Sequence, residues 1–156
     1  MSPSPRSTVP ALLIFISLHS LSLLLSASLA AAEQPARKEA DDFTGTYVMD
    51  SGNKAGGTLK VLHLPENRLK FELECNRGAP SYNSGEASGI LEVKNAAAVY
   101  RTTEFGGACE LRFEFQKKGV TVSQKGSDAD CGFGFGVRCD GSYRLKSRTP
   151  PKLSEE

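Results

Sequence analysis

The chain has no tryptophan and only two histidines, and each shortage argues against a class of function. Tryptophan is the residue most often used to stack on sugar rings, so a lectin would have to rely on Tyr47, Tyr82 or the phenylalanines. A Ser-His-Asp or Cys-His site needs an imidazole. His19 lies in an apolar N-terminal stretch, which leaves His63, placed near a strand end. We therefore expect no catalytic residues and a protein that is not an enzyme.

Long apolar runs are also scarce, because the chain has only one and it lies near the N-terminus. Arg6 precedes this run, which extends from Ala11 to Leu25, and small residues follow it as far as Ala32. Charge, apolar stretch and small residues in this order are typical of a removable signal peptide. The run is too short and too interrupted by serine to span a bilayer comfortably, and no cysteine follows at the distance of a lipid anchor. We predict a signal peptide over 1–32 and an exported protein, periplasmic or secreted, without a membrane anchor.

Clustered charge of one sign is missing as well. Cleavage after Ala32 removes one of the 19 basic residues and none of the 18 acidic residues, so the remaining chain is almost neutral. Its charges are scattered singly, whereas nucleic acids and anionic membranes require clustered basic charge. Neither is expected as a partner. Of the 156 residues, 124 remain after cleavage, which is enough for one compact domain, and we expect a monomer.

Cysteine is sparse but even in number. Cys75, Cys109, Cys131 and Cys139 all follow the predicted signal peptide. In a small exported chain, four cysteines indicate two structural disulfides, and their positions leave all three connectivities open. The chain has no C-x-x-C pair and one histidine beyond the signal, so we expect neither a metal site nor a cofactor.

Short segments with a β pattern occupy the chain between Phe43 and Lys146. In Arg68–Cys75 and Ala108–Gln116, apolar residues alternate with polar or charged ones, as in antiparallel strands with one face in water. Weaker signals bring the series to about eight strands: Thr46–Asp50, Gly57–Leu64, Gly89–Lys94, Ala97–Thr103, Val120–Lys125 and Ser142–Lys146. No helix is expected in this part. The short, sequential connections favour an all-β antiparallel meander barrel, with a two-sheet sandwich as the alternative.

The ends of this region carry two similar triplets, Gly45-Thr46-Tyr47 and Gly141-Ser142-Tyr143. They suit two terminal strands that meet to seal a barrel. We place the domain at 43–146, a flexible leader at 33–42 and a disordered tail at 147–156, because both flanks are polar, charged and contain proline.

Two segments hold the candidate binding residues. The polar stretch Asn76–Ser88 is interpreted as a long loop, and it contains Tyr82, Asn83 and Ser84. Loops longer than a meander needs often carry binding sites, although a mobile excursion fits the pattern equally well. The second segment follows Cys131, where Phe133 and Phe135 alternate with glycines. Either these rings contact a partner, or at least one of them plugs the end of the barrel.

Three aspartates near the second segment raise the question of calcium. Asp128, Asp130 and Asp140 lie close in sequence, but the glycine falls one position early for an EF-hand loop and no glutamate closes the loop. We therefore interpret the segment as a turn rich in Asp and Gly.

Three motifs follow one another in the C-terminal part: C-x-L-x-F-x-F from Cys109, D-C-G-F-G from Asp130, and D-G-S-Y from Asp140. Together they resemble a group of small bacterial exported β proteins that are largely uncharacterised, over roughly 108–146. The resemblance implies a disulfide between Cys109 and Cys131, with Cys75–Cys139 as the second bridge. Strand geometry also allows the alternative pairing of Cys75 with Cys109 and Cys131 with Cys139.

Size, export and disulfides are also loosely similar to those of the small periplasmic β-barrel inhibitors of lysozyme, whose inhibitory loop carries Ser-Gly-x-x-Tyr. In this chain Ser84-Gly85 and Ser88-Gly89 both lack the tyrosine, so no inhibitory residue carries over. We predict an exported binding module that acts on a protein through surface loops in the cell envelope, with an enzyme inhibitor as one form of such a module. The alternative is a small-ligand carrier, although Leu69, Phe71, Leu73, Phe113 and Phe115 are bulky enough to fill a barrel.

Overall fold

The computed structural model describes residues 42–50 and 55–154. The predicted signal peptide and nearly all of the predicted leader lie outside these ranges. The described residues form eight strands: β1 (Gly45–Asp50), β2 (Gly56–Leu64), β3 (Arg68–Asn76), β4 (Ser84–Glu92), β5 (Ala97–Thr102), β6 (Cys109–Gln116), β7 (Gly119–Lys125) and β8 (Gly141–Ser147). A single 3-10 turn, η1 (Ala129–Cys131), precedes β8. Within the same ranges, no helix has the length and apolar character needed to cross a membrane.

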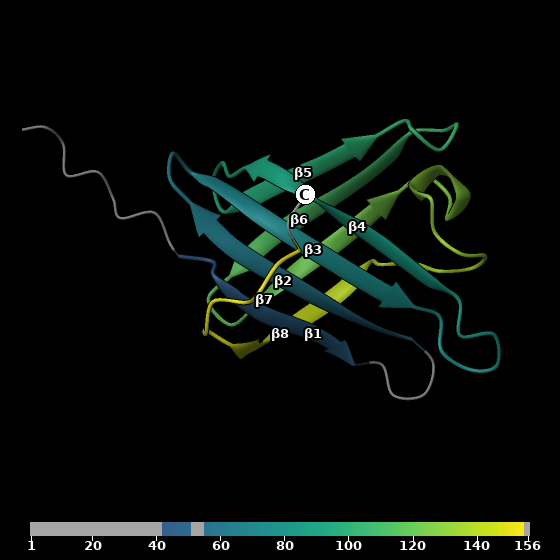
Figure 1. Cartoon of the computed structure of the whole chain (residues 1–156), viewed down its shortest axis with the longest axis horizontal. Coiled ribbons are helices and arrows are strands. Elements are labelled where there is room, and N and C mark those ends of the chain that lie inside the picture. Colours follow the sequence, from purple (N-terminus) through teal and green to yellow (C-terminus); the bar gives the residue numbers. More distant parts are fainter. Residues whose placement is uncertain (1–41, 51–54, 155–156) are drawn as a thin grey trace, which may run out of the picture. The chain divides into compact units, whose positions relative to one another are not determined.

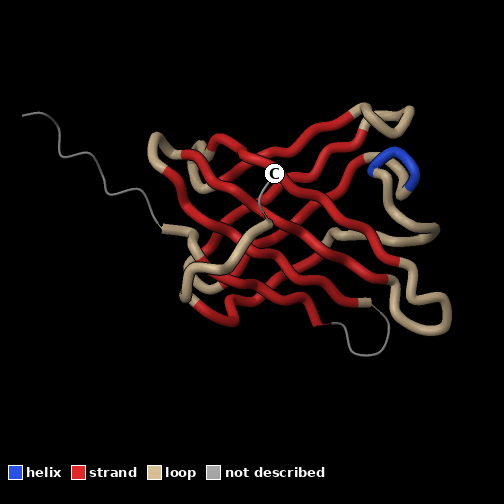
Figure 2. The backbone as a smooth tube through the Cα atoms, viewed as in Figure 1, coloured by secondary structure: helices blue, strands red, loops and turns tan. Residues whose placement is uncertain are grey.

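All strand pairs are antiparallel, and the strands form one sheet in the order β4-β3-β2-β1-β8-β7-β6-β5. The sheet curls into a barrel that is closed except between β4 and β5 (Figures 1 and 2). The predicted eight-stranded meander barrel is therefore confirmed, and the sandwich is not formed. Each predicted strand is present, with ends that differ by at most one residue except at β4.

The first and last strands close the barrel, and the two predicted triplets lie at this junction. Tyr47 pairs with Leu145 across β1 and β8. Tyr47 in β1 and Tyr143 in β8 are both buried, and the hydroxyl of each donates a hydrogen bond to the main-chain carbonyl four residues earlier. The Tyr47 hydroxyl lies 2.8 Å from the Phe43 oxygen, and the Tyr143 hydroxyl lies 2.9 Å from the Cys139 oxygen. These paired corners fix how the terminal strands enter the sheet.

A glycine two residues before each tyrosine makes this close approach possible. At Gly45 a Cβ atom would lie 2.5 Å from the main-chain oxygen of Ser147, and at Gly141 it would lie 2.5 Å from the sulfur of Met49. A side chain at Gly45 would push β1 and β8 apart, whereas one at Gly141 would require the Met49 side chain to move. Both glycines thus lie where β1 and β8 approach closely.

The interior of the barrel is filled by the inward-facing residues, which alternate with outward-facing ones along the strands. All five bulky residues expected to fill it are buried, and the Phe71 and Phe113 rings pack with their centroids 5.0 Å apart. Phe43 stacks on Phe115 at 4.4 Å at one end of this core. The fully buried set also includes Leu59, Val61, Leu111, Val122 and Val137.

The C-terminal tail differs from the prediction of disorder. Ser147 belongs to β8, and the chain beyond it lies extended across the outside of β2 and β3 (Figure 1, yellow). Lys70 donates from Nζ to the Ser154 oxygen at 2.8 Å, and the Ser154 amide donates to the Glu72 carboxylate. Arg148 donates to the Asp42 oxygen at 2.8 Å. Composition could not reveal these bonds, because their partners lie on strands far away in the sequence.

Candidate functional site

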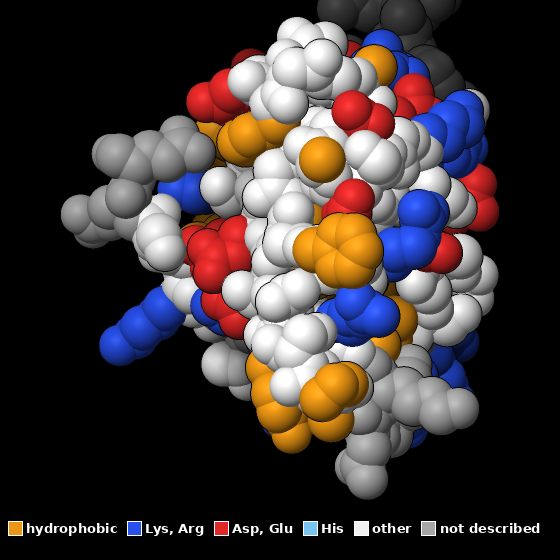
Figure 3. Space-filling view, turned by 90° about the vertical axis from the view of Figure 1, so that its right-hand side faces the viewer, with side chains coloured by type: hydrophobic (Ala, Val, Ile, Leu, Met, Phe, Trp, Pro, Cys, Tyr) orange, Lys and Arg blue, Asp and Glu red, His pale blue; other side chains and the backbone are white. Residues whose placement is uncertain are grey.

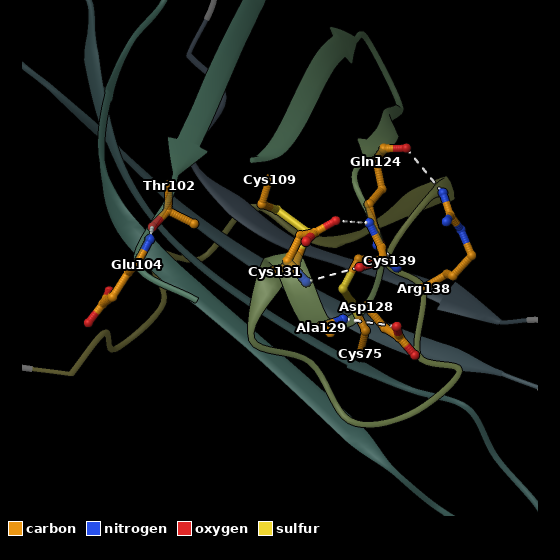
Figure 4. The surroundings of a disulfide bond; sticks show 12 residues. Cys75, Thr102, Glu104, Cys109, Gln124, Asp128, Ala129, Cys131, Arg138 and Cys139 are labelled. Atoms are coloured by element: carbon orange, nitrogen blue, oxygen red, sulfur yellow. Dashed lines mark hydrogen bonds between the residues drawn. A yellow bond between two sulfur atoms is a disulfide. The ribbon is translucent and has the colours of Figure 1, made fainter. Parts of the chain in front are cut away.

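One end of the barrel is covered by the chain between β7 and β8, residues 126–140, which we call the end segment. Both disulfides hold it. Cys131 in η1 is bonded to Cys109 at the start of β6, and Cys139 is bonded to Cys75 in β3 (Figure 4). This is the pairing that the resemblance implied, and the alternative pairing is wrong. All four cysteines therefore serve to fix one segment to two opposite parts of the sheet.

Two carboxylates fix the turn at the start of the end segment. Asp128 accepts from the amide of Ala129 at 2.9 Å and from the amide of Gly136, and Asp130 accepts from the amide of Ser127 at 2.7 Å. These backbone hydrogen bonds hold the pKa of both carboxyls below their ordinary value. The described residues contain no group of three or more potential metal ligands. Both carboxylates therefore accept hydrogen bonds from main-chain amides of the end segment itself.

Asp140, the third aspartate, accepts from Nε of Arg138 at 2.6 Å. The same guanidinium donates to the main-chain oxygen of Gln124 at 3.1 Å, and the Gln124 side-chain oxygen accepts from the Cys139 amide at 2.9 Å. Gln124 is buried, and its side-chain nitrogen has no hydrogen-bond partner among the described residues. Gln124 was not among the predicted site residues, although its side chain faces inward like those of Val120 and Val122 on the same strand.

The middle of the end segment alternates between inward and outward side chains. Phe133 and Val137 are buried at 6% and 0% exposure, whereas Phe135 between them is 78% exposed. Phe133 lies on Gly85 of β4, where a Cβ would come within 2.5 Å of the ring. The prediction that at least one of the two rings plugs the barrel end is confirmed for Phe133. Phe135 is left as a displayed ring.

The predicted long loop is shorter than expected. β4 begins at Ser84, so the connection after β3 covers only residues 77–83. The strand start was missed because Gly85 and Ala87, its inward-facing residues, are too small to produce an apolar alternation. At Gly85 there is no room for a side chain, because the ring of Phe133 occupies the space beneath it.

The two predicted binding segments meet at this end of the barrel. Asn83 donates from its side-chain amide to the Phe135 oxygen at 2.7 Å. The Gly134 amide donates to the Ser84 oxygen at 2.9 Å, so one main-chain hydrogen bond joins the end segment to the start of β4. Tyr82, next to Asn83, is 71% exposed. Four of the five predicted residues therefore lie at one surface, and the fifth, Phe133, supports it from below.

Four exposed side chains lie on the end segment or beside it, and we call them the rim: Arg77, Tyr82, Phe105 and Phe135. The Arg77 guanidinium lies 5.7 Å from the centre of the Phe135 ring. Phe105 is 50% exposed and lies against Gly132, where a Cβ would come within 2.6 Å of the ring. Figure 3 looks onto this end of the barrel, where hydrophobic side chains reach the surface among basic and acidic ones. Arg77 and Phe105 lie outside any repeating pattern, and the sequence offered no signal for either.

The backbone fixes the position of Tyr82. The residue has φ of 52°, in the left-handed region that costs energy for a residue other than glycine, and its amide donates to the Gly78 oxygen at 2.8 Å. Strained backbone of this kind persists only where the surroundings enforce it. The main chain at Tyr82 thus has a defined conformation, from which the exposed side chain leaves.

His63 lies at the end of β2 away from the rim, paired with Leu69. Its ring stacks on Phe43 with centroids 6.0 Å apart, and Nδ1 lies 3.7 Å from the Asp42 carboxylate. Its amide donates to the Thr44 hydroxyl at 3.0 Å. The contacts of His63 thus hold the start of the chain against β2.

Comparison of the chain with protein-family models, with curated proteins and with solved structures finds no match. The rim is therefore interpreted from its own geometry.

Proposed function

We propose that this protein is an exported, non-enzymatic binding module that engages a protein partner of the cell envelope through the rim, in keeping with the small exported β proteins that it resembles. The observation that carries the proposal is the display of Phe135, 78% exposed, on a segment that two disulfides fix to the barrel. Disulfides suit an oxidising compartment outside the cytoplasm. An enzyme inhibitor is one form that such a module takes.

The chemistry of the rim supports a protein partner. Aromatic rings and arginine are enriched in interfaces and often dominate their binding energy. Phe135 and Tyr82 offer large apolar area, and Arg77 adds a charged, planar donor beside it. Because the disulfides and the hydrogen bonds of Asp128 already order the end segment, little conformational entropy is lost when a partner binds.

The packing of the interior favours this surface over the alternative of a small-ligand carrier. Phe71, Phe113 and Tyr100 interlock across the barrel, with ring centroids 5.0 and 5.6 Å apart. A carrier would need a cavity at this place.

Site-specific photocrosslinking tests the proposal. A photoreactive phenylalanine analogue at Phe135 is expected to trap one discrete protein in the cells that produce the chain, because the ring is expected to be buried in the interface. The matched control places the analogue at Gln116, an exposed position at the opposite end of the barrel. The adduct is expected to disappear when Arg77→Glu is combined with the analogue at Phe135. An adduct pattern that is the same from both positions would contradict the proposal.

A further inference from the structure

The barrel has one open seam, between β4 and β5. These strands stand at the two ends of the sheet order, and among the described residues no main-chain hydrogen bond joins them beyond their connecting turn. At that turn Lys94 and Ala97 exchange hydrogen bonds of 2.8 and 3.0 Å, while Asn95 and Ala96 have φ of 52° and 57°. The strands then diverge. The Ser84 oxygen, at the far end, is covered by the end segment. Between these two points both strand edges lack a partner strand in the part of the chain that the structure describes.

The direction of the main-chain groups of β4 follows from the alternation of a strand. The Val93 amide donates to Asn67, on the β3 side, so the odd-numbered residues of β4 direct their amides and carbonyls toward β3. The even-numbered residues face the other way, as the Ser84 oxygen confirms by accepting from the end segment. Ser88 and Ile90 therefore direct their main-chain groups into the seam.

The same reasoning applies to β5. Ala96 accepts from the Phe115 amide on the β6 side, so the odd-numbered residues face the seam. Ala97 uses its groups in the turn, and no described strand pairs with the main-chain groups of Val99 and Arg101. Two facing sets of main-chain donors and acceptors thus border the seam.

The seam holds a groove of about 580 Å³. Its floor contains Leu91 and Ala98, whose side chains belong to the core, and its outer wall contains Ile90 and Val99. Ile90 is 50% exposed although it is a large apolar residue. The groove therefore brings apolar side chains together with main-chain edges, which an added β-strand needs, while charged and polar residues make up half of its lining.

Charge at the groove selects among possible strands. Lys94, Arg101 and Arg112 line it against one carboxylate, that of Glu92. All three cations are paired: Lys94 contacts Glu92 at 2.9 Å, and the arginines contact Glu110 and Glu114 on the outer surface. Exposed ion pairs of this kind are weak and exchange readily, and the lining residues alone carry a positive excess. It attracts an acidic strand, and it opposes edge-to-edge pairing of two copies of this chain, which would bring like charges together.

We propose that the β4–β5 seam is a second binding site, which takes an extended, acidic peptide segment of a partner protein as an added β-strand. Main-chain bonds to Ser88 and Ile90 on one side, or to Val99 and Arg101 on the other, hold the segment, and its carboxylates face the basic residues. Natural proteins commonly block an open edge with proline or a bulge. Neither β4 nor β5 contains a proline, and the β3–β4 register is continuous.

Selection from a displayed library of linear ten-residue peptides on the disulfide-bonded protein tests this site. We expect the selected peptides to be rich in Asp, Glu and β-branched residues, and one of them is synthesised with blocked ends as the probe. Ile90→Pro removes an edge donor without touching the β3 ladder, and it is expected to weaken probe binding about tenfold. The matched variant Ile90→Thr keeps the amide and is expected to bind within about twofold of the unmodified protein.

Further variants keep the test decisive if Ile90→Pro fails to fold. Arg112→Glu changes only an exposed side chain and is expected to weaken an acidic probe about tenfold and to reduce its salt dependence. Phe135→Ser at the rim is expected to leave probe binding unchanged, which separates this site from the proposed function. Failure to select any peptide, equal binding by Ile90→Pro or Arg112→Glu, or a dimer in sedimentation that Ile90→Pro dissolves would each overturn the proposal.

Discussion

Alanine at Phe133 and alanine at Phe135 should have opposite consequences, although the residues are two positions apart. Phe133 is 6% exposed and packed on Gly85, and truncating a buried phenylalanine costs about 3–5 kcal/mol. We expect about 3 kcal/mol, since the site lies at the end of the core. Phe135 is 78% exposed and loses mainly its contact with Arg77, worth about 0.5 kcal/mol at an exposed site. A domain of this size is stable by only about 5–15 kcal/mol, so the first loss is large and the second is small.

Urea unfolding with both disulfides intact measures the two free energies of unfolding. The midpoint is expected to fall strongly in Phe133→Ala and to stay nearly unchanged in Phe135→Ala, with the same dependence on urea in both. The reverse order, or equal losses, would refute the assignment of Phe133 as the support and Phe135 as the displayed ring.

The two disulfides and Asp128 give further predictions. The Cys75–Cys139 bridge spans 64 residues, and replacing both of its cysteines by serine should lower the free energy of unfolding by about 4 kcal/mol. The Cys109–Cys131 bridge spans 22 residues, and the same replacement there should lower it by about 3 kcal/mol. Equal losses in urea titrations would contradict the loop-entropy argument. The Gly136 amide holds the pKa of Asp128 below its ordinary value of 3.8, so the carboxylate stabilises the fold fully above about pH 3.8, and this stabilisation is lost as the pH falls through the lowered value. Asp128→Asn should weaken the pH dependence of the urea midpoint in that acidic range, and an unchanged dependence would show that the amide contacts do not favour the ionised form.

The strands were predictable wherever inward and outward residues differ strongly. In β3 and β6, apolar residues alternate with charged ones, and this pattern alone places Leu73 and Phe113 in the core. The repeated triplets indicated the pairing of β1 with β8, and Gly45 and Gly141 both lie where these two strands approach closely. The start of β4 was not predictable, since Gly85 reads as a loop residue until its neighbour Phe133 is known.

The candidate site was predictable in parts. Exposed aromatic residues in glycine-rich or polar segments pointed to Tyr82 and Phe135, but nothing in the sequence showed that the two segments meet. That meeting depends on the disulfides and on the bond from Asn83 to the Phe135 carbonyl, which join residues about 50 positions apart. The open seam was likewise invisible, because the divergence of two strands is set by the curvature of the whole sheet.

The neighbouring places of β1 and β8 bear on how the chain folds. Every other strand pairing joins segments that follow one another in sequence, whereas this pairing must wait until the last strand is available. Contacts between distant segments slow folding, so closure of the barrel is expected to be the late step. A circular permutant that links Arg148 to Asp42 and opens the chain at Asn95 would turn all seven pairings into hairpins without cutting a strand ladder. Such a chain should fold faster than the natural one, with the order of its strands in space unchanged.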